Sequence, residues 1–157
     1  MNLQWECKRF DELSPYQLYA ALRLRSEVFV VEQNCIFLDM DDKDAESFHL
    51  LGYAGDKLVA YTRIVPPGVI YSQASIGRVV TSPLVRRTGA GKVLMEQSLR
   101  TLNNLYGKVS IKIGAQLYLK AFYESFGFVQ IGEGYLEDGI PHIHMLREPG
   151  DTQVMEK

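Results

Sequence analysis

The sequence predicts an α/β fold in one domain, organised around a central strand, helix and strand. Short apolar segments alternate along the 157 residues with segments whose apolar side chains recur at helical spacing, and there are no internal repeats. An apolar strand over 75–81, a helix over 89–106 and a strand over 109–113 follow one another. A crossover of this kind makes its two strands parallel. The length is enough for one domain with a single hydrophobic core.

The remaining elements are predicted from local signals on either side of this crossover. Ser14 and Pro15 begin a helix, because a hydroxyl that can cap the helix precedes a proline at the first helical position, and apolar residues then recur to about Glu32. A Gly-Asp turn at 55–56 predicts a hairpin, and Gly107 ends the long helix. The predicted strands are 3–10, 49–54, 57–65, 75–81, 109–113, 128–131 and 142–146, and the predicted helices are 15–32, 89–106 and 117–125.

Composition and charge restrict the class of protein. Hydrophobic residues make up 46% of the chain and charged residues 23%, which is typical of a soluble globular protein. The net charge of −2 argues against a nucleic-acid binder, and no apolar run approaches the roughly 18 residues of a membrane span. Cys7 and Cys35 have no close spacing partner, so we expect reduced thiols and a cytoplasmic location. Residues 1–147 are expected to form the domain, as a monomer or homodimer, and residues 148–157 a disordered tail.

The turn between the strand at 75–81 and the following helix has the chemistry of a phosphate site. Arg86–Gly91 reads RRTGAG, so its glycines leave backbone N–H groups accessible beside the positive end of a helix. Ligands of open α/β sheets also bind at this carboxyl end of the strands. The residues of a nucleotide-hydrolysing loop and of a dinucleotide-binding motif are both absent, which leaves the pyrophosphate of coenzyme A. The alternative is a flexible, well-capped start of a helix without a ligand.

Two motifs match a known family in sequence and order. The pattern of Arg86, Gly89 and Gly91 resembles the pyrophosphate motif Q/R-x-x-G-x-G/A of the GNAT acetyltransferases, and Tyr123 in AFYESFGF resembles the family's tyrosine before a Gly-Phe pair. The resemblance implies the GNAT acyl-CoA N-acyltransferase fold, an α/β fold with a mixed twisted sheet and helices on both faces. More narrowly, the chain resembles the ElaA-type branch, through the stretches 24–35, 39–44, 76–80, 114–116 and 137–143.

The resemblance implies an N-acetyltransferase that moves an acetyl group from acetyl-CoA to a primary amine by direct attack, in a small molecule or a protein. Tyr123 is the implied acid for the leaving thiolate and a contact of the cosubstrate. Backbone N–H groups at Val79 and Val80 are the implied oxyanion and pantetheine contacts. The implied pyrophosphate contacts are Arg86, Arg87, Thr88, Gly89, Ala90 and Gly91. The alternative function is a non-catalytic module that binds acyl-CoA without turnover.

The general base and the acceptor are less constrained by the sequence. Glu32, at the end of the first helix, is the first candidate for the base, and His142 is the alternative. Five carboxylates within 39–46 predict either a solvated loop or an attractor for a cationic amine. No metal is expected, because the histidines lack ligand spacing. Departures from the branch pattern at 36–37, Tyr118 and His144 concern the choice of acceptor.

Overall fold

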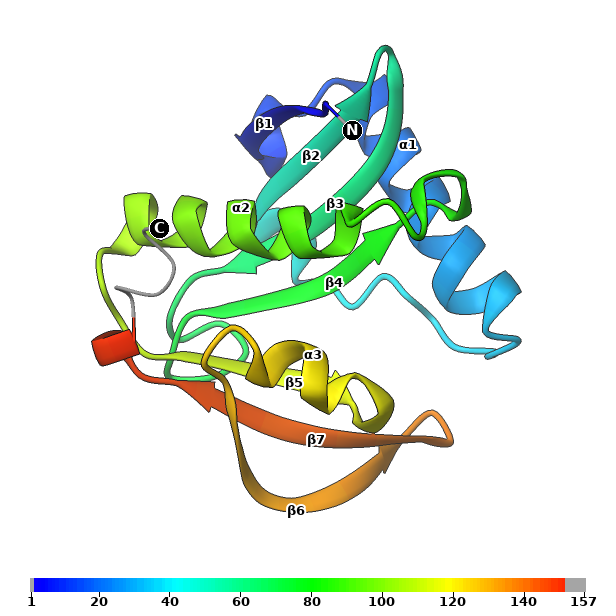
Figure 1. The fold of residues 1–157 in the computed structure, drawn as a ribbon. Helices are drawn as coiled ribbons and strands as arrows, with labels where there is room; N and C mark the ends of the chain where they lie inside the picture. Colours follow the sequence, from blue (N-terminus) through cyan, green and yellow to red (C-terminus); the bar gives the residue numbers. More distant parts are fainter. Residues whose placement is uncertain (1, 152–157) are drawn as a thin grey trace.

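Two antiparallel sheets open away from each other in the computed structural model, which describes residues 2–151 (Figure 1). The first has the order β1-β2-β3-β4 and the second the order β5-β7-β6. Residues 152–157 of the expected tail lie outside the described residues. The strands are β1 Gln4–Arg9, β2 Phe48–Ala54, β3 Lys57–Val65, β4 Ser75–Thr81, β5 Ile111–Gln116, β6 Val129–Glu137 and β7 Ile140–Arg147. The α-helices are α1 Pro15–Arg25, α2 Ala90–Tyr106 and α3 Lys120–Glu124.

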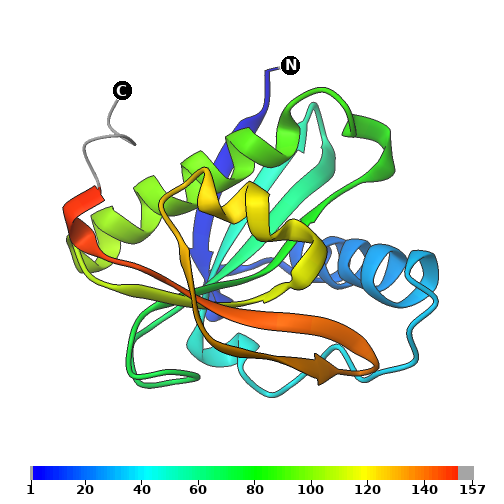
Figure 2. The ribbon, with the colours of Figure 1, turned by 60° about the horizontal axis from the view of Figure 1, so that its bottom comes forward.

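The predicted crossover is present, but its two strands pair only at one end. Ala74 and Ile111 form an isolated parallel bridge, and the N–H of Lys112 donates to the carbonyl of Ala74 at 3.0 Å. Beyond this point β4 and β5 diverge, as both views of the ribbon show (Figures 1 and 2). The expected mixed sheet is therefore two antiparallel sheets that, among the described residues, are joined by one parallel bridge.

Helices cover both faces of the first sheet, as predicted. Successive residues of a strand point to opposite faces, and accordingly Leu50 and Ala60 pack in the cluster of α2 while Leu51 and Tyr61 pack in the cluster of α1. The α2 cluster also joins the two sheets across the bridge. Its fully buried members include Leu94, Met95, Leu99 and Leu102 from α2 and Ile111, Ile113 and Met145 from the second sheet.

The first helix begins where the sequence predicts and ends in an unusual form. The hydroxyl of Ser14 accepts from the N–H of Gln17 at 3.1 Å, and the Gln17 side chain accepts from the N–H of Ser14 at 3.0 Å. This reciprocal cap explains why α1 starts at Pro15. After Arg25 the chain continues as a π-helical segment over Ser26–Glu32. Segments of this kind are rare and occur frequently at functional sites, and this one ends beside the space between β4 and β5.

Two late strands are displaced from their predicted bounds. The strand expected at 109–113 is β5, Ile111–Gln116, and the strand expected at 128–131 is the first part of β6, Val129–Glu137. The second half of β6 escapes the sequence pattern because Gly132, with φ of 70°, shifts the register against β7 between Ile131 and Tyr135. The shift breaks the alternation of side chains on which a strand prediction depends.

The acidic loop is neither solvated nor free to attract a cation, so both expectations for it are wrong at its central carboxylates. Arg25, which is 1% exposed, donates to Asp39 at 2.7 Å and to Asp44 at 2.9 Å. A buried charge requires an opposite charge beside it, and the loop supplies it. Asp42 and Glu46 remain exposed.

Two further arginines extend this pairing into a six-residue ionic cluster. Arg63 of β3 donates to Asp41 at 2.7 Å and to Asp44 at 3.0 Å, and Arg78 of β4 donates to Asp39 at 2.8 Å. Burial disfavours the charged form of Asp44, but the hydrogen bonds and charges of the arginines outweigh it and lower the pKa of this carboxyl below its ordinary value of 3.8. The cluster therefore ties α1, the loop and two strands together.

Replacing Asp44 tests this cluster. Because Asp44→Asn leaves two buried guanidinium groups short of a partner, we expect unfolding to require about 3 kcal/mol less free energy at neutral pH. A carboxyl whose pKa is lowered by folding stabilises the protein above its unfolded pKa and loses that contribution as the pH falls further. Below about pH 4 the difference between parent and variant should therefore shrink in urea unfolding. A constant difference from neutral to acid pH would contradict the assignment.

Candidate functional site

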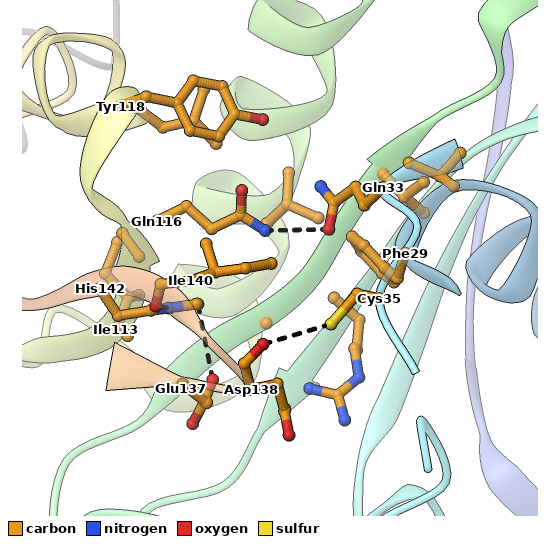
Figure 3. A pocket seen from close by; sticks show the side chains of 18 of the residues that line it. Phe29, Gln33, Cys35, Ile113, Gln116, Tyr118, Glu137, Asp138, Ile140 and His142 are labelled. Carbon is orange, nitrogen blue, oxygen red and sulfur yellow. Dashed lines mark hydrogen bonds and ion pairs between the residues drawn. The ribbon is translucent and has the colours of Figure 1, made fainter. Parts of the chain in front are cut away.

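A cleft of about 550 Å³ lies where β4 and β5 part, as Figure 3 shows from close by. Its walls come from the π-helical end of the first helix, from β4, from the end of β5 and from the turn between β6 and β7. The cleft collects six of the residues predicted for the site, although they are far apart in the sequence. They are Glu32, Val79, Val80, Arg86, Tyr123 and His142.

A bulge in β4 shapes the wall that carries Val79 and Val80. Tyr61 pairs with Val80 and Arg63 with Gly77, so β4 has one residue more than β3 over this stretch. Arg78 takes up the extra length with φ of 51°, a left-handed conformation that is uncommon for a residue with a side chain. A bulge leaves one residue out of the ladder and bends its strand. The ladder of hydrogen bonds between β3 and β4 is therefore interrupted where β4 faces the cleft.

Tyr123 lies on α3 at the cleft, with an unpartnered hydroxyl. The side chain is 6% exposed, and its ring packs edge-on against Phe122 and Phe128. Within residues 2–151 the hydroxyl makes no hydrogen bond. Burial raises the pKa of Tyr123 above its ordinary value of 10.0, and the nearby Tyr118 raises it further. The phenol is thus held protonated, with a proton that it can donate into the cleft.

The turn predicted to bind a pyrophosphate, Arg86–Gly91, leads into the start of α2. Only Arg86 of this turn lines the cleft. Gly89 has φ of 82° and directly precedes the helix, which begins at Ala90. A Cβ atom added at Gly89 or Gly91 would meet no atom within 4 Å. The space in front of the first helical N–H groups is therefore open, as an anion site at a helix N-terminus requires.

Glu32 and Arg86 face each other at the edge of the cleft and form a bidentate ion pair. The two guanidinium nitrogens lie 2.5 and 2.6 Å from the two carboxylate oxygens. The hydrogen bond from Arg86 lowers the pKa of Glu32. A carboxylate with a lowered pKa is a weaker base, so this environment is unfavourable to the role predicted for Glu32.

The hydrogen bond of His142 determines which of its ring nitrogens carries the proton. Its Nδ1 lies 2.7 Å from the carbonyl oxygen of Ile140, and because a carbonyl can only accept, Nδ1 carries the proton. The neutral ring therefore has its lone pair on Nε2, which lies 3.5 Å from a carboxylate oxygen of Glu137. The ring of Tyr135 stacks on the imidazole.

Comparison with known proteins identifies the family of this chain. Residues 22–149 match the acetyltransferase (GNAT) domain family. The chain belongs to the GNAT family. It is 44% identical to protein ElaA of Escherichia coli K12 over 148 residues, which cover 93% of this chain and 97% of the relative.

Solved structures show the same GNAT fold. An acyl-CoA N-acyltransferase from Pseudomonas aeruginosa has a TM-score of 0.88 at 42% identity, over 93% of this chain and 99% of that one. Escherichia coli ElaA has a TM-score of 0.87 at 43% identity, over 94% of this chain and 100% of that one. The predicted family, its ElaA-type branch and the fold are confirmed.

An acyl-CoA, which GNAT proteins use, fits the arrangement of the described residues. Added Cβ atoms at Gly89 and Gly91, in the turn and first residues of α2, would meet open space, and Arg86 and Tyr123 both line the cleft. No three histidine, cysteine or acidic side chains within residues 2–151 are grouped to hold a metal ion. None of the helices in the same range is long and apolar enough to cross a membrane.

Several residues of the cleft were not singled out from the sequence. The side-chain amide of Gln116, the last residue of β5, donates across the cleft to Gln33 at 3.3 Å, and the thiol of Cys35 donates to the carbonyl of Asp138 at 3.5 Å (Figure 3). The signal that could have placed Asp138 is its pairing with Gly139. Both have positive φ, 50° and 78°, as a two-residue hairpin turn requires.

Proposed function

We propose that this GNAT protein transfers an acetyl group from acetyl-CoA to a primary amine by direct attack. The observation that carries the proposal is one cleft that contains both a buried, unpartnered phenol, Tyr123, and an imidazole lone pair, that of His142. The two groups suit the two proton transfers of such a reaction. A cytoplasmic location belongs to the same proposal and is supported by the free thiols of Cys7 and Cys35.

The turn before α2 would hold the pyrophosphate of the donor. The N–H groups of the turn and the helix start, from Arg87 to Gly91, can donate to phosphate oxygens, and the open space at Gly89 and Gly91 admits a close approach. The thioester would then lie along the interrupted part of β4. An N–H group at Val79 or Val80, which line the cleft beside the bulge, would stabilise the oxyanion that forms at the thioester carbonyl.

His142 and Tyr123 would manage the protons. His142 takes a proton from the acceptor's ammonium at Nε2, and the resulting imidazolium pairs with Glu137. The free amine attacks the thioester carbon, so a C–N bond forms and the C–S bond breaks. Tyr123 donates its proton to the departing sulfur. The raised pKa of Tyr123 keeps the phenol protonated until negative charge develops on that sulfur. The product nitrogen then releases its extra proton to water, and the phenolate of Tyr123 and the imidazolium of His142 return to their starting forms by proton exchange with water.

The substitution Gly91→Asp tests the proposed pyrophosphate site by changing CoA affinity without destabilising the fold. Gly91 lies in the first turn of α2, where a carboxylate favours the helix and a side chain improves its propensity. We therefore expect a melting temperature at or above that of the parent. Affinity for CoA should fall more than about tenfold by calorimetry, since the carboxylate meets a pyrophosphate. The neutral control Gly91→Asn should keep most of the affinity, and equal affinities in both variants would contradict the site.

Tyr123→Phe tests the acid. The substitution keeps the ring packing against Phe122 and Phe128 and removes only a hydroxyl that has no partner within residues 2–151. We expect kcat for acetyl transfer to fall by about 10²–10⁴, with CoA affinity and melting temperature unchanged. A kcat equal to that of the parent would show that Tyr123 is only a packing residue.

His142→Asn and Glu32→Gln distinguish the two candidate bases. An asparagine can still donate to the carbonyl of Ile140, but it has no lone pair at the position of Nε2. A base acts in its unprotonated form, so the acidic limb of the kcat/KM profile should be absent in His142→Asn and retained in Glu32→Gln. The opposite result would assign the base to Glu32, as the sequence predicts.

A further inference from the structure

The positive charges that line the cleft have ion-pair partners, and the negative charges at one end of it do not. Its two arginines, Arg78 and Arg86, are bound to carboxylates at 2.5–2.8 Å. The carboxylates of Glu137 and Asp138, in contrast, have no cationic partner among residues 2–151 while His142 is neutral. One end of the cleft therefore presents two uncompensated negative charges, whereas the two arginines of the cleft are already neutralised.

A buried side chain at the same end has one nitrogen whose partner depends on protonation. His142 is 8% exposed, and its Nε2 lies 3.5 Å from a carboxylate oxygen of Glu137. This contact is an ion pair when the ring is protonated, and it brings two acceptors face to face when the ring is neutral, as the proposed base requires. Two acceptors facing each other at this distance are unfavourable unless a third group donates to both. An alkylammonium has three N–H donors and a positive charge. It would satisfy both acceptors at once, and it is the protonated form of the proposed acceptor.

Asp138 adds a second carboxylate beside the first. Its backbone is held at the cleft by the left-handed turn with Gly139 and by the bond from the Cys35 thiol to its carbonyl. Glu137, Asp138 and His142 come from one hairpin, as Figure 3 shows. A single ammonium needs only one of the two carboxylates.

We infer that the acceptor is a small aliphatic diamine, with one ammonium bound between His142 and Glu137 and the other bound by Asp138. The inference rests on the proposed acetyl transfer. The amine beside His142 is deprotonated and acetylated as described above, and the amine at Asp138 stays protonated and anchors the molecule. An acceptor with a carboxylate in place of the second amine would face Asp138 with like charge, and the two arginines found in the cleft lining, Arg78 and Arg86, are already paired.

Matched acceptors test the inference on the intact protein with acetyl-CoA, by release of free thiol. Cadaverine should exceed n-pentylamine in kcat/KM by about five- to thirtyfold, the factor that one or two kcal/mol produces. The kcat/KM for 6-aminohexanoate, which has a carboxylate in place of the second amine of cadaverine, should be lower than that for n-pentylamine. Equal values for the diamine and the monoamine would overturn the inference and leave acetyl transfer standing. Preferred acetylation of a single lysine in a peptide would overturn it as well.

Variants assign the two ammonium groups. Asp138→Asn keeps a residue that tolerates the left-handed turn, and it should raise the KM for cadaverine by about five- to thirtyfold without changing that for n-pentylamine. Glu137→Gln should raise the KM for both amines. The control Glu133→Gln, an exposed carboxylate of β6 outside the cleft, should change neither. An equal effect of Asp138→Asn on both amines would overturn the assignment of the second ammonium.

Binding provides a readout that is independent of turnover. Calorimetry of the CoA-saturated protein should show tighter binding of cadaverine than of n-pentylamine, and Asp138→Asn should abolish the difference. Equal binding of the two amines to the parent would overturn the inference. If no amine releases thiol from acetyl-CoA, the proposed function fails, and the inference fails with it.

Discussion

The divergence of β4 from β5 is the constraint on which the rest of this protein depends. One parallel bridge at Ala74 and Ile111 holds the two strands together, and the core under α2 closes the same end of the molecule. From there the strands leave each other, so the backbone and side chains that would otherwise complete a continuous sheet face a cleft. The buried core fixes the strands at the bridged end, and no ladder joins them beyond it. The opening between β4 and β5 is therefore built into the fold.

The wall on the β4 side is positioned by charge. Arg78 lies at the bulge of β4 and is bound by Asp39, which also binds Arg25 of the first helix. A residue with positive φ in the middle of a strand requires surrounding contacts that hold it, and this ionic cluster provides them. Asp39 of the acidic loop thus contributes to the site indirectly, because it holds Arg78 and with it the bulge of β4. Its own charge is paired with arginines.

The opposite wall has the reverse electrostatics. The hairpin of β6 and β7 brings Glu137 and Asp138 to the cleft, and no arginine among residues 2–151 pairs with them. At the other edge Arg86 is neutralised by Glu32, and the N-terminus of α2 lies next to this pair in the chain. The proposed donor and acceptor would therefore meet different surroundings, with helix N–H groups near one edge and two carboxylates at the other. Charges in a cleft with low-dielectric walls act more strongly than on an open surface, so this separation favours a defined orientation of donor and acceptor.

The sequence by itself determined the element order, the cap at Ser14, the turn at Arg86–Gly91 and the position of Tyr123 before Gly127, because each of these depends on neighbours within a few residues. Periodicity likewise placed Met95, Leu99 and Leu102 on the buried face of α2. Only the tertiary structure decided which charged groups meet. Asp39 is 39 residues from Arg78, and Glu32 is 54 from Arg86.

The acidic loop and the hairpin carry carboxylates of the same chemistry. Folding buries Asp39 and Asp44 of the loop against arginines, and it leaves Glu137 and Asp138 of the hairpin at the cleft. No local pattern distinguishes the two sets, because the state of a carboxylate is set by the charges and the burial that distant segments bring to it.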